Sequence, residues 1–164
     1  MSPTRNDSFR DNDRPKRLTA ILSLCQRMNS ITDLGAILDL LVREAAGLMD
    51  AERATIFLLD PTKTELLSQV ALGSDQVIRC DATRGIAGAA LAAGEVLNIP
   101  NAYQDPRFNN AVDRQTGYRT RNLLASPLVH PIDGETIGVF EVLNRKVGPF
   151  VPSGRKNRLP RSIR

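Results

Sequence analysis

The sequence is poor in the side chains that most often perform catalysis or bind metals. Among 164 residues it has no tryptophan, two tyrosines, two cysteines and one histidine. Cys25 and Cys80 stand alone, without the spacings of zinc sites or redox pairs, and their apolar neighbours predict buried, reduced thiols. With His130 as the single histidine, hydrolytic and metal-dependent chemistry lack their usual residues. We therefore expect no enzyme activity and no metal site.

Long apolar runs are also missing. No stretch approaches the roughly 18 uncharged apolar residues of a membrane-spanning helix. The first residues, Met1–Arg10, are polar and are not followed by the apolar segment of a signal peptide. These absences predict a cytoplasmic protein that has no membrane partner.

The basic charge is confined to the end of the chain. The formal net charge is +4, but residues 154–164 contain five Lys/Arg and no acid, so the rest of the chain carries one net negative charge. Such a distribution indicates a basic tail and not a basic patch on the folded body. Nucleic acid is therefore an unlikely partner, although the tail would be the place for such a contact.

What is present is a clear alternation of helical and strand patterns. Apolar residues recur at helical spacing over Leu18–Met28 and again over Leu34–Met49, where Thr32 or Asp33 would cap the second helix. Strands are predicted at 53–59, 65–72, 77–80, 96–99, 122–129 and 136–143, and a short helix at 85–93. Because helices and strands do not alternate singly, the order predicts an α+β fold on a mainly antiparallel sheet.

One long connection interrupts this pattern. Residues 101–121 are polar, and they contain only a short predicted helix at about 109–115. Connections of this length without regular structure are uncommon in compact domains and are usually functional. We interpret the segment as a lid over a pocket.

Six segments along the chain carry a resemblance to a known family. They are, in order, Ala51–Asp60, Gly85–Gly88, Leu97–Pro100, Asp105–Phe108, Thr116–Asn122 and Ile137–Asn144. Together they resemble the GAF domain, the small-molecule-sensing module of many signalling proteins, and are most similar to the cyclic-nucleotide-binding GAF domains of phosphodiesterases and bacterial adenylate cyclases. The resemblance runs from about Leu34 to Phe150. It implies a GAF-like sheet with the N-terminal helices on one face and the short helix plus lid on the other.

The resemblance also implies a function and a site. It implies a non-catalytic regulatory domain of a signalling protein, which binds cyclic AMP or cyclic GMP beneath the lid. The implied ligand-binding residues are Thr55, Ile86, Ala87, Asn109, Asp113, Thr116, Thr120 and Glu141. The unpaired N–H groups that begin the helix at Gly85 would suit a cyclic phosphate. Threonine hydroxyls and the two carboxylates would serve the sugar or the base.

Each of these positions also has a purely structural interpretation. Gly85 and Gly88 are small enough to serve only for close packing, and Asp113, Thr116 and Thr120 would equally cap and turn the lid. Glu141 needs a partner if it faces the core, and has no evident role if it faces outward.

The chain departs from the family pattern in two places. Ala71 and Leu72 stand where the family often brings an aromatic ring and a carboxylate to the purine, so the identity of the purine stays open. Near the end, Gly154 and Arg155 replace an acidic pair, and a basic segment replaces an amphipathic helix. We expect disorder at 1–16, a GAF-like domain without its C-terminal helix at 17–150, and a disordered basic tail at 151–164, as in a truncated fragment.

Other members of the fold are less consistent with the sequence. Bilin photoreceptors attach their pigment through a lid cysteine, and methionine-sulfoxide reductases need a cysteine cluster, neither of which Cys25 and Cys80 supply. The main alternative is a ligand-free module that forms homodimers through the N-terminal helices, Leu18–Met49, and relays a signal.

Overall fold

The computed structural model describes residues 14–28 and 33–150. Its centre is a six-stranded sheet with the strand order β3-β2-β1-β6-β5-β4, in which all pairs are antiparallel. The strands are β1 (Ala51–Leu59), β2 (Glu65–Ala71), β3 (Arg79–Asp81), β4 (Leu97–Ile99), β5 (Leu123–Val129) and β6 (Thr136–Arg145). The predicted α+β class and antiparallel sheet are confirmed.

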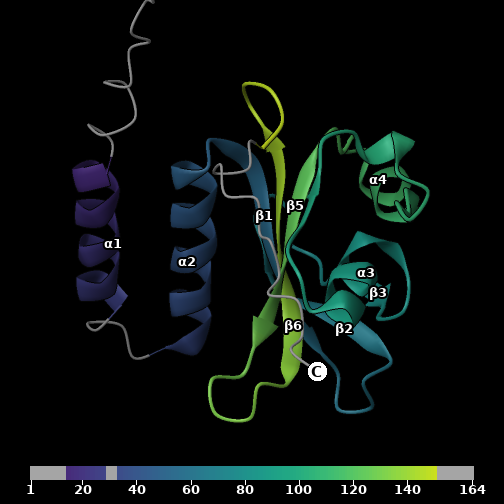
Figure 1. The fold of residues 1–164 in the computed structure, drawn as a ribbon, viewed down its shortest axis with the longest axis horizontal. Coiled ribbons are helices and arrows are strands. Elements are labelled where there is room, and N and C mark those ends of the chain that lie inside the picture. The colour runs from purple at the N-terminus through teal and green to yellow at the C-terminus, as the bar shows by residue number, and fades with distance from the viewer. Residues whose placement is uncertain (1–13, 29–32, 151–164) are drawn as a thin grey trace, which may run out of the picture.

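The N-terminal helices cover one side of this sheet in two layers. Helix α2 (Leu34–Leu48) lies directly against the sheet, and α1 (Arg14–Met28) lies beyond it (Figure 1). Asp33 caps α2, since its carboxylate accepts a hydrogen bond from Ala36 N at 3.0 Å. Helix α1 begins at Arg14, before the expected domain start at residue 17, because a proline such as Pro15 is tolerated in the first turn of a helix.

The opposite face carries the elements that form the pocket. These are α3 (Gly85–Ala93), a single 3₁₀ turn η1 (Ala102–Gln104) and α4 (Ala111–Thr116), the last two within the lid at 101–121 (Figure 1). Two separate apolar clusters fill the two faces. One joins Phe57 and Leu66 to α3, and the other joins Ile56 and Val142 to Val42 of α2.

Some expectations need correction or lie outside the described residues. Cys25 is exposed on α1, so the prediction of a buried thiol is wrong there, because α1 packs on α2 and not in the core. Cys80 is partly buried, as predicted. Of the segments expected to be disordered, 1–16 and 151–164, residues 1–13 and 151–164 lie outside the described residues, and residues 14–16 belong to α1. Within the described ranges, no helix is both long and apolar enough to span a membrane.

Candidate functional site

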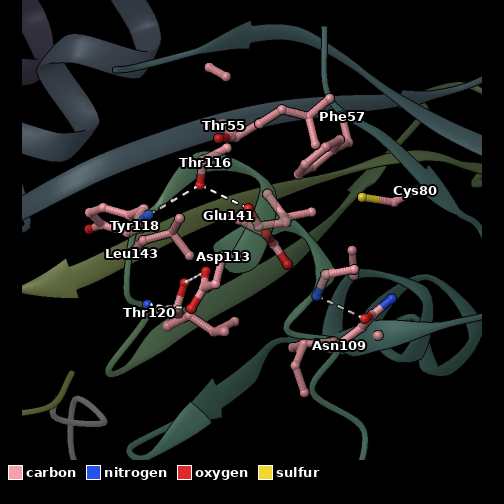
Figure 2. A pocket seen from close by; sticks show the side chains of 18 of the residues that line it. Thr55, Phe57, Cys80, Asn109, Asp113, Thr116, Tyr118, Thr120, Glu141 and Leu143 are labelled. Atoms are coloured by element: carbon pink, nitrogen blue, oxygen red, sulfur yellow. Dashed lines mark hydrogen bonds between the residues drawn. The ribbon is translucent and has the colours of Figure 1, made fainter. Parts of the chain in front are cut away.

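A cavity of about 220 Å³ lies between the sheet, α3 and the lid (Figure 2). All eight residues that the sequence predicted as ligand contacts line it. They come from five places in the chain, since β1, α3, the loop before α4, α4 with the segment after it, and β6 each contribute. The fold thus brings the predicted site together.

The N-terminus of α3 opens onto the cavity. Arg84 stands at the cap position but makes no side-chain capping bond, and the first intrahelical bond runs from Gly88 N to Arg84 O at 3.2 Å. The N–H groups of Gly85, Ile86 and Ala87 precede that bond, so the helix leaves them without an intrahelical acceptor. They lie at the positive end of the helix dipole, which favours an anion.

The two glycines of this helix have different structural roles. Gly85 has a φ of 74°, a left-handed conformation that glycine adopts without strain. At Gly88 an added Cβ would lie 2.8 Å from Ala82 O. The close-packing interpretation therefore holds for Gly88, whereas Gly85 makes the turn that leads into the N–H groups without an intrahelical acceptor.

The floor of the cavity is formed by two polar side chains on neighbouring strands. Thr55 of β1 stands opposite Glu141 of β6 in the antiparallel register. Within the described residues the Glu141 carboxylate has no hydrogen bond and no ion pair, and it faces the cavity (Figure 2). Burial raises the pKa of this carboxyl to about 7. Thr55 is 4% exposed, and in the described chain its hydroxyl also has no partner.

The lid residues, in contrast, are already bonded to one another. Asp113 accepts hydrogen bonds from the Tyr103 hydroxyl at 3.0 Å, from Thr120 N at 2.7 Å and from Thr120 Oγ1 at 2.7 Å. Thr116 Oγ1 donates to Val112 O at 2.8 Å, and Asn109 Oδ1 accepts from Ala111 N at 3.1 Å. These hydrogen bonds support the interpretation that the polar lid residues cap and turn the lid.

Asn144 of β6 holds the end of the lid segment in place. Asn144 is fully buried and has a φ of 54°. Its Oδ1 accepts from Arg121 N at 2.6 Å and from Asn122 N at 3.3 Å, and its Nδ2 donates to Arg119 O at 2.8 Å and to Glu52 at 3.1 Å. One buried amide thus holds the segment in which the lid returns to β5.

Among the cavity-wall residues that sequence reasoning missed, two form a stacked pair. Arg53 and Tyr118 both line the cavity, and the Arg53 guanidinium carbon lies 3.8 Å from the centroid of the Tyr118 ring. Arg53 precedes Thr55 by two residues, and alternate residues of a strand share a face, so this period would have placed it on the pocket side. No local pattern would have brought Tyr118 to it.

Comparison with known proteins identifies the fold family. The GAF domain model matches residues 33–155. The chain belongs to the GAF domain family. It is 36% identical over 135 residues to a probable 3',5'-cyclic phosphodiesterase of Caenorhabditis elegans, pde-5, an alignment that covers 74% of this chain and 18% of that protein. The chain therefore spans less than a fifth of the length of this relative.

Solved structures agree on the fold. A GAF domain from an Acinetobacter phosphoenolpyruvate-protein phosphotransferase superposes with a TM-score of 0.70 at 22% identity, covering 84% of this chain and 82% of that chain. The free methionine-R-sulfoxide reductase of Neisseria meningitidis has a TM-score of 0.67 at 20% identity, covering 87% of this chain and 80% of that one. At such identities the likeness concerns the fold alone. In this chain Cys80 lines the cavity, and burial raises the pKa of its thiol to about 11, which keeps it protonated near neutral pH.

Proposed function

We propose that this chain is a non-catalytic sensory GAF domain that binds a cyclic nucleotide, cyclic AMP or cyclic GMP, in the cavity beneath the lid. The observation that carries the proposal is the set of unsatisfied polar groups on the cavity wall. The N–H groups that begin α3 suit the anionic cyclic phosphate. The unpartnered Thr55 hydroxyl and Glu141 carboxylate suit the sugar or base.

The relative from Caenorhabditis elegans supports the choice of ligand class. It is named a probable 3',5'-cyclic phosphodiesterase, and the alignment covers 74% of this chain. Since the chain spans a small part of that protein, its phosphodiesterase activity is not carried over with the resemblance. What the resemblance supports is a regulatory cyclic-nucleotide site.

Ligand entry requires the lid to move. The cavity of about 220 Å³ is smaller than most ligand pockets, which measure about 300–1,000 Å³. A nucleotide therefore binds to an expanded form of the pocket and shifts the population toward it. The extent of this shift is limited by the difference in the ligand's affinity for the two forms.

Titration calorimetry of the chain with cyclic AMP and cyclic GMP tests the proposal. Adenosine and guanosine serve as matched ligands that lack the phosphate, and we expect them to bind more weakly than the cyclic nucleotides. Binding should also raise the midpoint of thermal unfolding with ligand concentration, because the ligand binds only the folded state. Absence of heat and of thermal protection with both cyclic nucleotides at millimolar concentration would refute it.

A second function, homodimerisation for signal relay, is supported by one face of α1. Leu18, Ile21 and Leu22 are 59%, 49% and 56% exposed, and Cys25 follows at helical spacing on the same face. In a two-fold contact between α1 helices, the same patch would meet itself. Light scattering and oxidative cross-linking through Cys25 test this dimer. We expect Leu22→Glu to give a monomer that no longer cross-links, and an unchanged mass would refute the α1 interface.

A further inference from the structure

The Arg53–Tyr118 contact is the one stacked pair on the cavity wall, among the described residues, that joins the sheet to the lid. The guanidinium of Arg53, on β1, covers the Tyr118 ring, which follows α4 in the lid. Its N–H groups have no hydrogen-bond acceptor and no carboxylate partner within the described part of the chain. The pair therefore offers the cavity a planar cation and an aromatic ring, neither of which is fully used by the protein.

The Arg53–Tyr118 pair lies near the two positions at which the sequence lacks the family's aromatic ring. Ala71 and Leu72 line the same cavity and offer no ring. Gly73, which follows Leu72, packs against Arg53, since a Cβ added to Gly73 would lie 2.9 Å from Arg53 Nε. The stack thus stands beside the end of β2, where the sequence lacks an aromatic residue. The lid supplies the ring of this pair to the cavity, in addition to the ring of Phe57 on β1.

Glu52 holds the ring in this position. Its carboxylate accepts hydrogen bonds from the Tyr118 hydroxyl at 2.8 Å, from Arg121 Nη2 at 2.5 Å and from Asn144 Nδ2 at 3.1 Å. Burial, and next the bond to Glu52, raise the pKa of the Tyr118 hydroxyl well above its usual value, so it remains a donor. Since Asn144 also fixes the end of the lid, the ring and the lid backbone share one anchor.

Nucleobases stack on aromatic rings and on guanidinium planes in proteins, whatever the base. We propose that the Arg53–Tyr118 stack is the platform on which the purine base of the ligand packs, and that Glu52 is the positioning residue that fixes its ring. This inference rests on the proposed function. It also assigns the lid a direct contact with the base, through the Tyr118 ring, which lines the cavity.

Two substitutions of Tyr118 separate the ring from its hydroxyl. Tyr118→Leu removes the platform, and we expect the affinity for both cyclic nucleotides to fall about tenfold to a hundredfold, the effect of losing one stacked base. Tyr118→Phe keeps the ring and should retain most of the affinity. Ribose 3',5'-cyclic phosphate without a base is the matched ligand, and its binding should be the same in the wild type and in both variants.

Glu52 is tested by coupling. Glu52→Ala and Tyr118→Phe each remove one end of the same hydrogen bond, so both should speed nucleotide dissociation. The double variant should dissociate no faster than Glu52→Ala alone, because a shared interaction is lost only once. Additive effects would overturn the positioning role.

Tyrosine emission gives a direct readout of the stacked base. The sequence has no tryptophan and only two tyrosines, Tyr103 and Tyr118. We expect saturating nucleotide to change the emission of the wild type more than that of Tyr118→Phe, in which Tyr103 alone emits. The base-free ligand should give the same change in both proteins.

Three results would overturn the inference. Tyr118→Leu could bind the nucleotides as the wild type does, which would place the base elsewhere, for example on Phe57. It could weaken the base-free ligand equally, which would make the effect structural. Finally, if the wild-type chain binds no cyclic nucleotide, the proposed function itself is refuted. This outcome is measured on the wild type alone and is therefore distinct from the two results with Tyr118→Leu.

Discussion

Replacing Glu141 by glutamine should remove most of the pH dependence of stability that originates in the cavity. The pKa of this carboxyl rises from 4.5 to about 7 because burial penalises its charged form. One pKa unit corresponds to about 1.4 kcal/mol. The wild type should therefore lose up to about 3 kcal/mol of its free energy of unfolding as the pH rises from 4.5 to 7. Water that enters the cavity screens the charge, which makes this an upper value.

The sign follows from the protons bound in each state. Below pH 4.5 the carboxyl is protonated in both states and contributes nothing. Between 4.5 and 7 the unfolded chain releases the proton while the folded chain keeps it, so stability falls with rising pH. Above 7 both states are ionised and the loss is constant. Glutamine is isosteric and neutral, so Glu141→Gln should become more stable than the wild type toward pH 8.

Urea unfolding of the two proteins, followed by circular dichroism between about pH 4 and pH 8, measures this difference. Subtracting one protein from the other cancels the titration of all remaining groups. A difference that stays flat over the whole range would show that the Glu141 carboxylate is solvated or paired in the folded chain. The reasoning that it is an unsatisfied acceptor would then be refuted.

Two further predictions concern the backbone and the lid. Gly138→Ala should destabilise the domain by about 1–3 kcal/mol, because the added Cβ would lie 2.1 Å from Phe57 O. Gly47→Ala in α2 meets nothing within 4 Å and should stabilise the domain by about 0.5–1 kcal/mol. Urea unfolding measures both changes, and equal effects would contradict the packing argument. Asn144→Gly keeps the left-handed backbone but removes the side-chain bonds, and it should speed amide hydrogen exchange at Arg121 and its neighbours; unchanged exchange would show that the lid is held elsewhere.

The fold was largely predictable because local patterns and tertiary packing agree. Strand-type composition at 53–59 and 136–143 predicted β1 and β6, and the Asp33 cap and apolar stripe predicted α2. The site residues of the sheet followed from the family resemblance, and the structure places them on the cavity wall. For these elements the apolar pattern in the sequence directly reflects the physical requirement that one face of each helix or strand is buried.

Contacts between distant segments were not predictable. Tyr118 and Glu52 are separated by 66 positions, and Asn144 and Glu52 by 92. Their hydrogen bonds depend on where the lid ends against β1 and β6, which no local period encodes. Cys25 shows the same limit in reverse. Its apolar neighbours suggested burial, but α1 packs on another helix and has two sides, one of which remains exposed.

The hydrogen bonds within the lid bear on how a ligand would be sensed. Asp113, Thr116 and Thr120 already satisfy one another or the lid backbone, so a ligand that bonds to them must replace existing bonds and gains little net energy by doing so. Groups without partners, at the start of α3 and on Glu141, give up no protein contact when they bind. The polar part of the affinity would therefore come mainly from α3 and the sheet, whereas the lid would contribute through the Tyr118 ring. Exchange of bonds within the lid would change its shape, so ligand binding would shift the population between the two lid shapes.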